Sequence, residues 1–283
     1  MKRCRQQGFS LVEMMVALVI GLFVLAGVGS VYITGKRSYQ ARDGLSLLQE
    51  NGRIAIRIIE QTVVRAGYPM FAEVQPVIVA PKSGLSLVSL QTQLEETMEP
   101  LKELGAQDSD SLEVIISNGR VKQVAGDILT VQYQAITEGS WRRGDDCLGS
   151  SSQLSDRVIS KLFLNIDNRT GIARLMCLGS GGGTQPLVDN VVAMQVEYGE
   201  DSNSDGFADK YLRVADVSDW NKVVAIRVGL LISSGEDVLD EPVNEPQIFT
   251  LAGQQVTLNS ENDRKLYRVF QTTIPLRNRM PIF

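Results

Sequence analysis

Histidine is absent from the 283 residues, and the chain has only three Cys and two Trp. Without His there can be no Ser-His-Asp or Cys-His nucleophile pair and no imidazole ligand for a metal. The sequence also has no Gly-rich phosphate loop and no nucleophile elbow of the kind that hydrolases use. These absences exclude the common designs of hydrolases and zinc enzymes, and we expect that the protein is not an enzyme.

A dense block of Lys and Arg residues is missing as well. The chain has 28 basic and 33 acidic residues, which gives a formal net charge of -5. A protein that binds nucleic acid needs a basic surface against the phosphates, so we expect no nucleic-acid partner. A hydrophobic fraction of 43% and a charged fraction of 22% are typical of a globular protein with one large or two small domains.

No charged residue occurs from residue 14 to residue 35. As a helix, this run crosses the roughly 30 Å of hydrocarbon in a bilayer, so we expect a membrane span over about residues 9–35. A cleaved secretory signal is one alternative, although its apolar core is usually about 7 to 15 residues long and ends at a small-residue site. A plain signal anchor is another, but Glu13 would then cost on the order of a few kcal/mol in lipid, because nothing pairs with it.

The stretch around this carboxylate reads Gly8-Phe9-Ser10-Leu11-Val12-Glu13 and follows a short basic leader. It resembles the cleavage and methylation motif of type IV prepilins. The resemblance implies that a prepilin peptidase removes residues 1–8 by cutting between Gly8 and Phe9, and that Phe9 is then N-methylated. Glu13 would pair with the amino group of Phe9 on a neighbouring subunit in the low-dielectric layer and set the axial register of assembly.

Beyond the span, apolar residues recur at spacings of three, four and seven, which is typical of an amphipathic helix. The stop signal Gly67-Tyr68-Pro69 then predicts one helix over residues 9–66, roughly 85 Å long. After Pro69 the apolar residues alternate, as in half-buried strands. The predicted strands are 112–116, 129–133, 162–166, 192–198 and 224–230, with a hairpin turn at 168–171 and loops at 99–111, 149–156 and 179–185. The expected fold class is therefore α+β and pilin-like, with the long N-terminal helix packed on a mainly antiparallel β-sheet head over residues 67–283.

Residues 48–53 with 65–68, and residues 268–270 with 276–279, look like the minor pilins of the PilW type. Such minor pilins are similar to the J-type pseudopilin of type II secretion. The resemblance implies a subunit near the pilus tip that primes pilus assembly and supports motility or adhesion. It implies as partners the prepilin peptidase, other minor pilins, the major pilin, an inner-membrane assembly platform and a tip adhesin. The chain would cross the inner membrane once, with its leader in the cytoplasm and its head in the periplasm, before it enters the pilus.

Two alternatives to this function stay open at the level of the sequence. The first is a pseudopilin of a type II secretion system. The sequence distinguishes this alternative from a minor pilin only through the PilW-like motifs near its two ends. The second is a membrane-anchored, calcium-dependent adhesin whose activity lies in the head. Glu13 argues against the second, because a simple anchor gains nothing from a carboxylate inside its apolar helix.

Cys147 and Cys177 stay in the mature head, whereas Cys4 leaves with the leader. An even number of Cys residues on the extracytoplasmic side predicts a disulfide between the two. Two buried free thiols, packed as small apolar side chains, are the alternative. A catalytic or metal-binding pair has neither a CxxC spacing nor a His to support it.

One loop of the head carries oxygen ligands at the spacing of a calcium loop. Asp201, Asn203 and Asp205 occupy its positions 1, 3 and 5, Gly206 and Asp209 occupy positions 6 and 9, and the Phe207 carbonyl could supply position 7. Position 12 is Leu212 instead of a bidentate Glu, so any calcium binding would be weak and of the extracellular type. The alternative is a polar hairpin in which Asp, Asn and Gly serve only the turn geometry.

Overall fold

A computed structural model describes residues 10–66, 112–134, 136–138, 141–143, 145–149 and 157–276. The chain divides into two compact units, Met1–Asp43 and Gly44–Phe283. Several predictions lie outside the described residues: the leader with Gly8 and Phe9, the stop signal at 67–69, the loop at 99–111 and most of the loop at 149–156.

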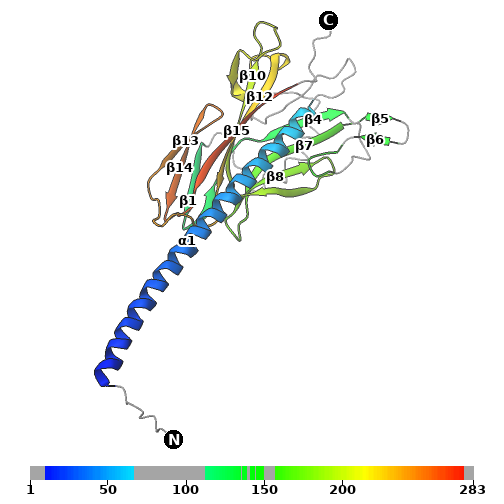
Figure 1. The fold of residues 1–283 in the computed structure, drawn as a ribbon. Coiled ribbons are helices and arrows are strands. Elements are labelled where there is room, and N and C mark those ends of the chain that lie inside the picture. Colours follow the sequence, from blue (N-terminus) through cyan, green and yellow to red (C-terminus); the bar gives the residue numbers. More distant parts are fainter. Residues whose placement is uncertain are drawn as a thin grey trace. The chain divides into compact units, whose positions relative to one another are not determined.

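The first unit consists of the first part of helix α1, which runs from Leu11 to Val64 (Figure 1). Its large apolar side chains from Leu11 to Ile33 are all exposed. This helix is long and apolar enough to cross a membrane. The prediction placed the helix over residues 9–66, and in the structure a turn at Arg65 and Ala66 follows Val64.

The second part of α1 belongs to the second unit and is buried along one face. The buried residues are three or four positions apart, which places them in a single stripe. They are Gly44, Leu48, Gly52, Ala55, Ile59, Thr62 and Val63. Ala55, Ile59 and Val63 join one hydrophobic core with residues from the strands, so this half of the helix is held by packing.

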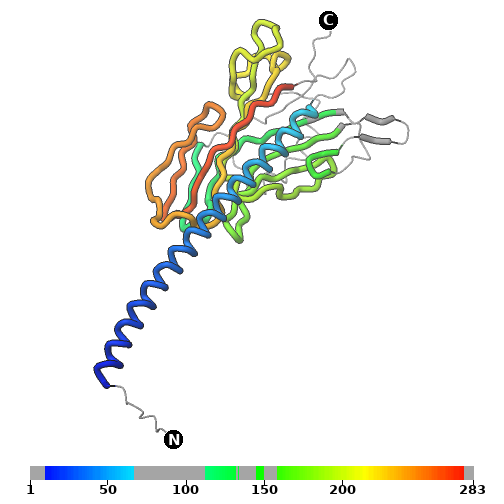
Figure 2. Tube along the Cα trace, in the orientation of Figure 1, coloured from blue at the N-terminus to red at the C-terminus, as the bar shows by residue number. Residues whose placement is uncertain are grey.

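Fifteen strands occur in the described part of the second unit. They are β1 (Glu113–Ser117), β2 (Arg120–Gln123), β3 (Ala125–Gly126), β4 (Leu129–Gln134), β5 (Ile136–Glu138), β6 (Trp141–Arg143), β7 (Arg157–Ile166), β8 (Ala173–Gly179), β9 (Thr184–Asp189), β10 (Val191–Glu200), β11 (Lys210–Leu212), β12 (Val223–Ser233), β13 (Gln247–Leu251), β14 (Gln254–Glu261) and β15 (Tyr267–Pro275). Figure 2 traces the course of the chain by colour, from blue near the N-terminus to red near the C-terminus.

The strands form three larger sheets and one two-stranded sheet. The orders of the larger sheets are β13-β14-β1-β2, β11-β10-β12-β15 with β3 beside β10, and β4-β7-β8-β9. Only the pairs β1–β14 and β10–β3 are parallel among the described strands. The predicted fold class, a long N-terminal helix packed on a mainly antiparallel β-sheet head, is therefore confirmed.

All five strands predicted from alternation are present, as β1, β4, β7, β10 and β12. The predicted turn at 168–171 joins β7 to β8, and the Asp167 side chain accepts hydrogen bonds from the amides of Arg169 and Thr170 there. The predicted loop at 179–185 is wrong at both ends, because Gly179 still belongs to β8, and Thr184 and Gln185 already belong to β9 and pair with β8. The pairing of β9 with β8 extends the strand to the edge of the Gly-rich turn, which is therefore shorter than the sequence predicted.

Candidate functional site

Glu13 lies in the first turn of α1, where its amide donates to the Ser10 carbonyl at 3.1 Å. Its side chain is exposed among the exposed apolar side chains of the first unit. Within the described residues, no ion pair or side-chain hydrogen bond involves this carboxylate. The structure therefore leaves Glu13 open to a partner, and its assembly role stays a prediction.

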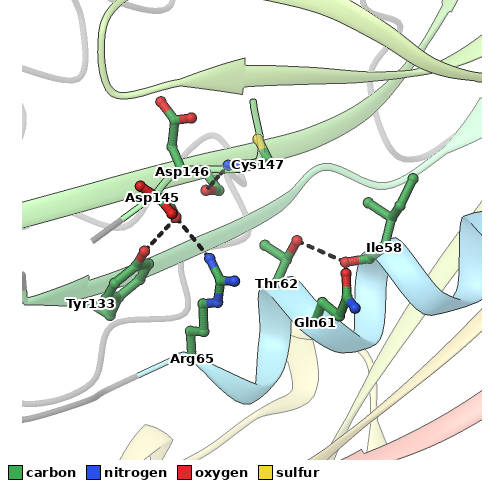
Figure 3. A pocket seen from close by; sticks show the side chains of 9 residues that line it. Ile58, Gln61, Thr62, Arg65, Tyr133, Asp145, Asp146 and Cys147 are labelled. Atoms are coloured by element: carbon green, nitrogen blue, oxygen red, sulfur yellow. Dashed lines mark hydrogen bonds between the residues drawn. The ribbon is translucent and has the colours of Figure 1, made fainter. Parts of the chain in front are cut away.

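A polar cluster surrounds residues 145–147 of the head (Figure 3). Nothing in the sequence indicated it. Arg65, just past the end of α1, donates from Nη1 to the Asp145 carbonyl oxygen at 2.9 Å. The Tyr133 hydroxyl of β4 donates to the same oxygen. The Cys147 amide donates to the Ser160 hydroxyl of β7 at 3.0 Å. One short segment thus joins the end of the helix to two strands of a sheet.

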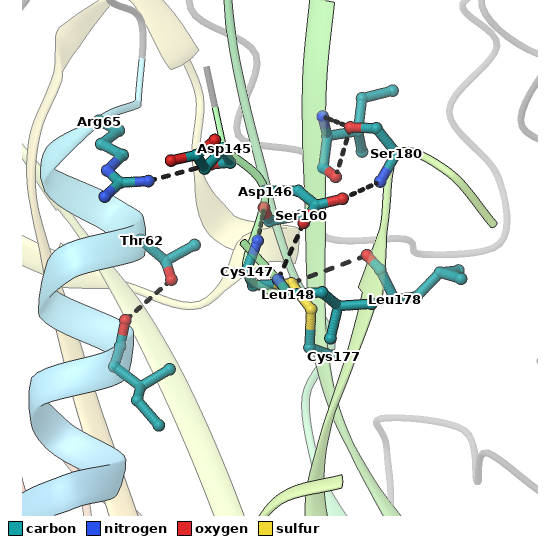
Figure 4. The surroundings of a disulfide bond; sticks show 12 residues. Thr62, Arg65, Asp145, Asp146, Cys147, Leu148, Ser160, Cys177, Leu178 and Ser180 are labelled. Atoms are coloured by element: carbon teal, nitrogen blue, oxygen red, sulfur yellow. Dashed lines mark hydrogen bonds between the residues drawn. A yellow bond between two sulfur atoms is a disulfide. The ribbon is translucent and has the colours of Figure 1, made fainter. Parts of the chain in front are cut away.

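Cys147 is bonded to Cys177 of β8, with their Cα atoms 6.1 Å apart (Figure 4). The buried Asp146 carboxylate lies beside this disulfide and accepts the amides of Leu148 and Ser180, both at 2.9 Å. Each oxygen of the carboxylate has its own donor, which holds the chain on both sides of the disulfide. The predicted disulfide between the two Cys residues is therefore present. The hydrogen bonds of Asp146 also link the two segments that the disulfide joins.

A pocket of about 110 Å³ lies between the end of α1 and this cluster. Its lining residues are Ile58, Gln61, Thr62, Arg65, Tyr133, Asp145, Asp146, Cys147 and Ser160. Burial raises the pKa of Tyr133 above its ordinary value, although the nearby Arg65 acts in the opposite direction. The phenol is therefore a hydrogen-bond donor at neutral pH. The hydrogen bonds among the lining residues connect the end of α1 to β4 and β7 through residues 145–147.

The loop from Asp201 to Asp209 is closed by carboxylates that accept backbone amides. Asp201 accepts the amides of Ser204 at 2.6 Å and Gly206 at 2.8 Å, one on each oxygen. Asp209 accepts the Ser202 amide at 2.7 Å. Ser204 and Gly206 have positive φ angles of 66° and 87°, which the tight turn requires.

The hydrogen bonds to Asp201 also affect the ionisation of its carboxyl group. Although burial acts to raise it, the amides of Gly206, Ser204 and Asp205 hold the pKa of Asp201 below its ordinary value. No group of three or more Asp, Glu, His or Cys side chains is placed to share a metal ion in the part of the chain that the structure describes. The five predicted ligands, Asp201, Asn203, Asp205, Phe207 and Asp209, do lie in one loop, and calcium binding stays a prediction.

Glu200, the residue just before this loop, binds groups outside the loop. Its carboxylate accepts the Ser218 hydroxyl at 3.1 Å and lies 3.4 Å from the ammonium group of Lys210. The ring of Phe207 is 75% exposed at the surface of the same loop. The described geometry is therefore that of a rigid acidic turn that presents one aromatic side chain.

Comparison with known proteins finds two family models that match parts of the chain, and it finds similar solved structures. Residues 165–278 match the family Type IV Pilus-assembly protein W, and residues 3–29 match the prokaryotic N-terminal methylation motif. The second match contains Gly8, Phe9 and Glu13. No curated protein matches the chain. The chain is similar to the type IV-like pilin TTHA1219 from Thermus thermophilus, with 17% identity, 70% of this chain and 100% of that chain covered, and a TM-score of 0.29.

Proposed function

Because the chain is a prepilin of the PilW type, we propose that it is a minor pilin that primes the assembly of type IV pili near the tip. In this function it supports pilus-dependent motility or adhesion. The family is a structural kind of protein, and its members work with other pilins and with membrane assembly machinery. The partners proposed for this chain are the prepilin peptidase, the other minor pilins, the major pilin and the inner-membrane assembly platform.

The observation that carries this proposal is the position of Glu13. It lies within the residues that match the methylation motif and in the first turn of a helix with exposed apolar side chains. In lipid an unpaired carboxylate is costly, on the order of a few kcal/mol, and a helix that serves only as an anchor gains nothing in return. The amino group of Phe9 on a neighbouring subunit would offset this cost, and that contact requires assembly.

Processing and location follow from the same motif. The proposed cut between Gly8 and Phe9 lies on the cytoplasmic side, so that the helix crosses the inner membrane and the head lies in the periplasm until assembly. The methylation motif and the long apolar helix are consistent with membrane anchoring. Mass spectrometry of the mature N-terminus tests the cut, and a chain that still begins at Met1 in cells with an active peptidase would contradict it.

The decisive experiment replaces Glu13 and measures incorporation into sheared pili. We expect Glu13→Ala to insert and to be cleaved normally, yet to be incorporated about tenfold less, because the partner amine loses its counter-charge. The matched control is Thr34→Ala in the same helix, since the Thr34 hydroxyl donates to the Ser30 carbonyl at 3.0 Å and needs no neighbour. Equal incorporation of Glu13→Ala and wild-type protein would overturn the proposal.

A pseudopilin of type II secretion is the competing function, and deletion of the gene separates the two. We expect the deletion strain to lose pili and twitching motility while its secreted proteins are unchanged. A strain that keeps its pili but loses secretion would replace the proposed function with the secretion function.

A further inference from the structure

Each of the three larger sheets ends in two outer strands, and five of these six are unsuited to pairing with another chain. Outer strands are usually protected by charge, proline, irregularity, short length or cover. β2 contains Arg120 and Lys122, β9 contains Pro186 and Asp189, and β15 contains Arg268 and Pro275. β11 has only three residues, and the described side chains of β4 are buried.

The sixth outer strand, β13, has none of these protections. Its residues Gln247–Leu251 include no charge and no proline, and its register with β14 is regular at all five positions. In the described structure β14 is its only strand partner. Ile248 is 65% exposed and Thr250 is exposed too, so no residue that the structure describes covers these two positions.

The turn that follows β13 determines which backbone groups point outward. Ala252 and Gly253 form a two-residue connection to β14 with φ angles of 45° and 76°, as in a type I′ turn. The pair beside such a turn, Leu251 and Gln254, exchanges hydrogen bonds, and the pairs alternate from there. Ile248 and Thr250 therefore belong to pairs without hydrogen bonds, and their N–H and C=O groups point to the free edge. Two donors and two acceptors are available.

The charge around β13 identifies the kind of strand that fits there. No Lys or Arg occurs between Arg227 and Arg264. Five exposed acidic residues precede β13: Glu236, Asp237, Asp240, Glu241 and Glu245. This surface favours a segment that carries basic residues at the end beside Glu245, and it disfavours a second copy of the same acidic surface.

We propose that β13 is a docking strand, on which an extended segment of another pilin subunit adds one strand to the sheet β13-β14-β1-β2. The segment is uncharged in its middle, where it pairs with Ile248 and Thr250, and carries Lys or Arg at the end beside Glu245. The inference rests on the proposed function, because it names the contact through which the head would meet its neighbour in the pilus. Backbone hydrogen bonds supply the attachment, and the alternating side chains supply the selection.

Amide hydrogen exchange tests this docking strand in the full-length protein, purified alone and purified with co-expressed pilins. We expect exchange at Ile248 and Thr250 to slow at least about tenfold in the complex, because their outward N–H groups become hydrogen-bonded. Ile248→Lys should abolish this protection through charge repulsion. The matched control is Gln255→Lys, an exposed position on β14 one strand in from the edge, and it should retain the protection.

Each other outcome overturns the proposal in a recognisable way. Co-purification with pilins without slower exchange at the two residues removes the docking strand and leaves the proposed function intact. Protection that grows with the concentration of the isolated protein, together with a dimer in sedimentation, identifies a second copy as the occupant. Failure to co-purify with any pilin refutes the proposed function and the docking strand with it.

Discussion

Gly52 of α1 lies directly against the ring of Phe270 of β15, so that a β-carbon on Gly52 would stand 2.3 Å from the Cζ atom of that ring. The two residues come from the two stretches, near the start and near the end of the chain, that resemble PilW-type minor pilins. The resemblance at the two ends of the sequence therefore marks one contact, in which the helix approaches the sheet closely because Gly52 has no side chain.

This contact predicts that Gly52→Ala destabilises the head, although Ala is the better helix former by about 1 kcal/mol. Forcing a methyl group into a packed contact typically costs about 1 to 3 kcal/mol, so we expect a net loss of about 1 kcal/mol in the free energy of unfolding. Denaturant unfolding followed by circular dichroism measures it. Adding Phe270→Leu to Gly52→Ala should recover part of the loss, and an increase in stability for Gly52→Ala alone would contradict the prediction.

The disulfide between Cys147 and Cys177 predicts a large loss of stability when both are changed to Ser. The bond spans 30 positions of sequence, and closing a loop of that length stabilises the folded state by about 3.5 kcal/mol in the chain-entropy model. Limited proteolysis of the oxidised and reduced protein measures the difference, and we expect cleavage first near residues 145–149. Two freely labelled Cys in unfolded, unreduced protein would rule out the bond.

Lys161 of β7 is 4% exposed, and among the residues that the structure describes its ammonium group has no hydrogen-bond partner. Burial lowers the pKa of Lys161 from its ordinary 10.5, so folding releases a proton between the lowered pKa and 10.5. We expect Lys161→Met to raise Tm by roughly 2 to 4 °C at neutral pH, for about 1 kcal/mol gained. Wild-type stability should rise as the pH rises through that window, so the advantage of the variant should shrink toward pH 10.5.

The control for this prediction is Lys122→Met, because Lys122 is exposed on β2 and should leave Tm unchanged. Thermal scans of the three proteins between pH 7 and pH 10 provide the comparison. A difference between Lys161→Met and wild type that does not depend on pH would show that burial of the ammonium group is not its cause.

The loop from Asp201 to Asp209 predicts weak calcium binding that stabilises the folded head. With a dissociation constant of about 1 mM, 10 mM calcium would add about 1.4 kcal/mol and raise Tm by about 3 °C. Asp205→Ala should remove this increase, whereas Asp219→Ala outside the loop should keep it. Asp205 is the better choice for substitution, because its carboxylate accepts one backbone amide, that of Phe207, whereas Asp201 accepts three. Identical melting curves in calcium and in chelator would leave the loop as a turn only.

The sequence was informative where one face of a strand or helix is buried and the other is not. The alternation in β1, β4 and β7 and the three-to-four spacing along α1 led to correct elements for that reason. β13, β14 and β15 were not predicted. Burial does alternate along β13 and β14, but the buried Gln254 and Ser260 are polar and the exposed Ile248 is apolar. In β15 the burial itself alternates only in part, so the apolar period is weak in all three strands.

The polar cluster at the end of α1 shows a second limit. The Arg65 side chain and the Asp145 carbonyl meet across 80 positions of sequence, and a carbonyl oxygen leaves no trace in residue type. Cys147 and Cys177 were found from their number, whereas the partners of Asp146 on either side of them depend on the fold. A rare residue type such as Cys therefore allows a bond to be predicted from the sequence. A hydrogen bond to a distant backbone group cannot be predicted in this way, because every residue has the same backbone groups.

The parallel pairing of β1 with β14 has a consequence for the order of events during synthesis. Ser117 and Glu261, which are partners at the end of this ladder, are separated by 144 positions. At about 5 to 20 residues per second, roughly 7 to 30 s pass between the appearance of the first and the second. Throughout this interval the apolar strand β1 lacks the neighbour it needs. Until its last strands emerge, a nascent head therefore exposes apolar surface of β1, and a ribosome that stalls before residue 261 leaves a chain prone to aggregation.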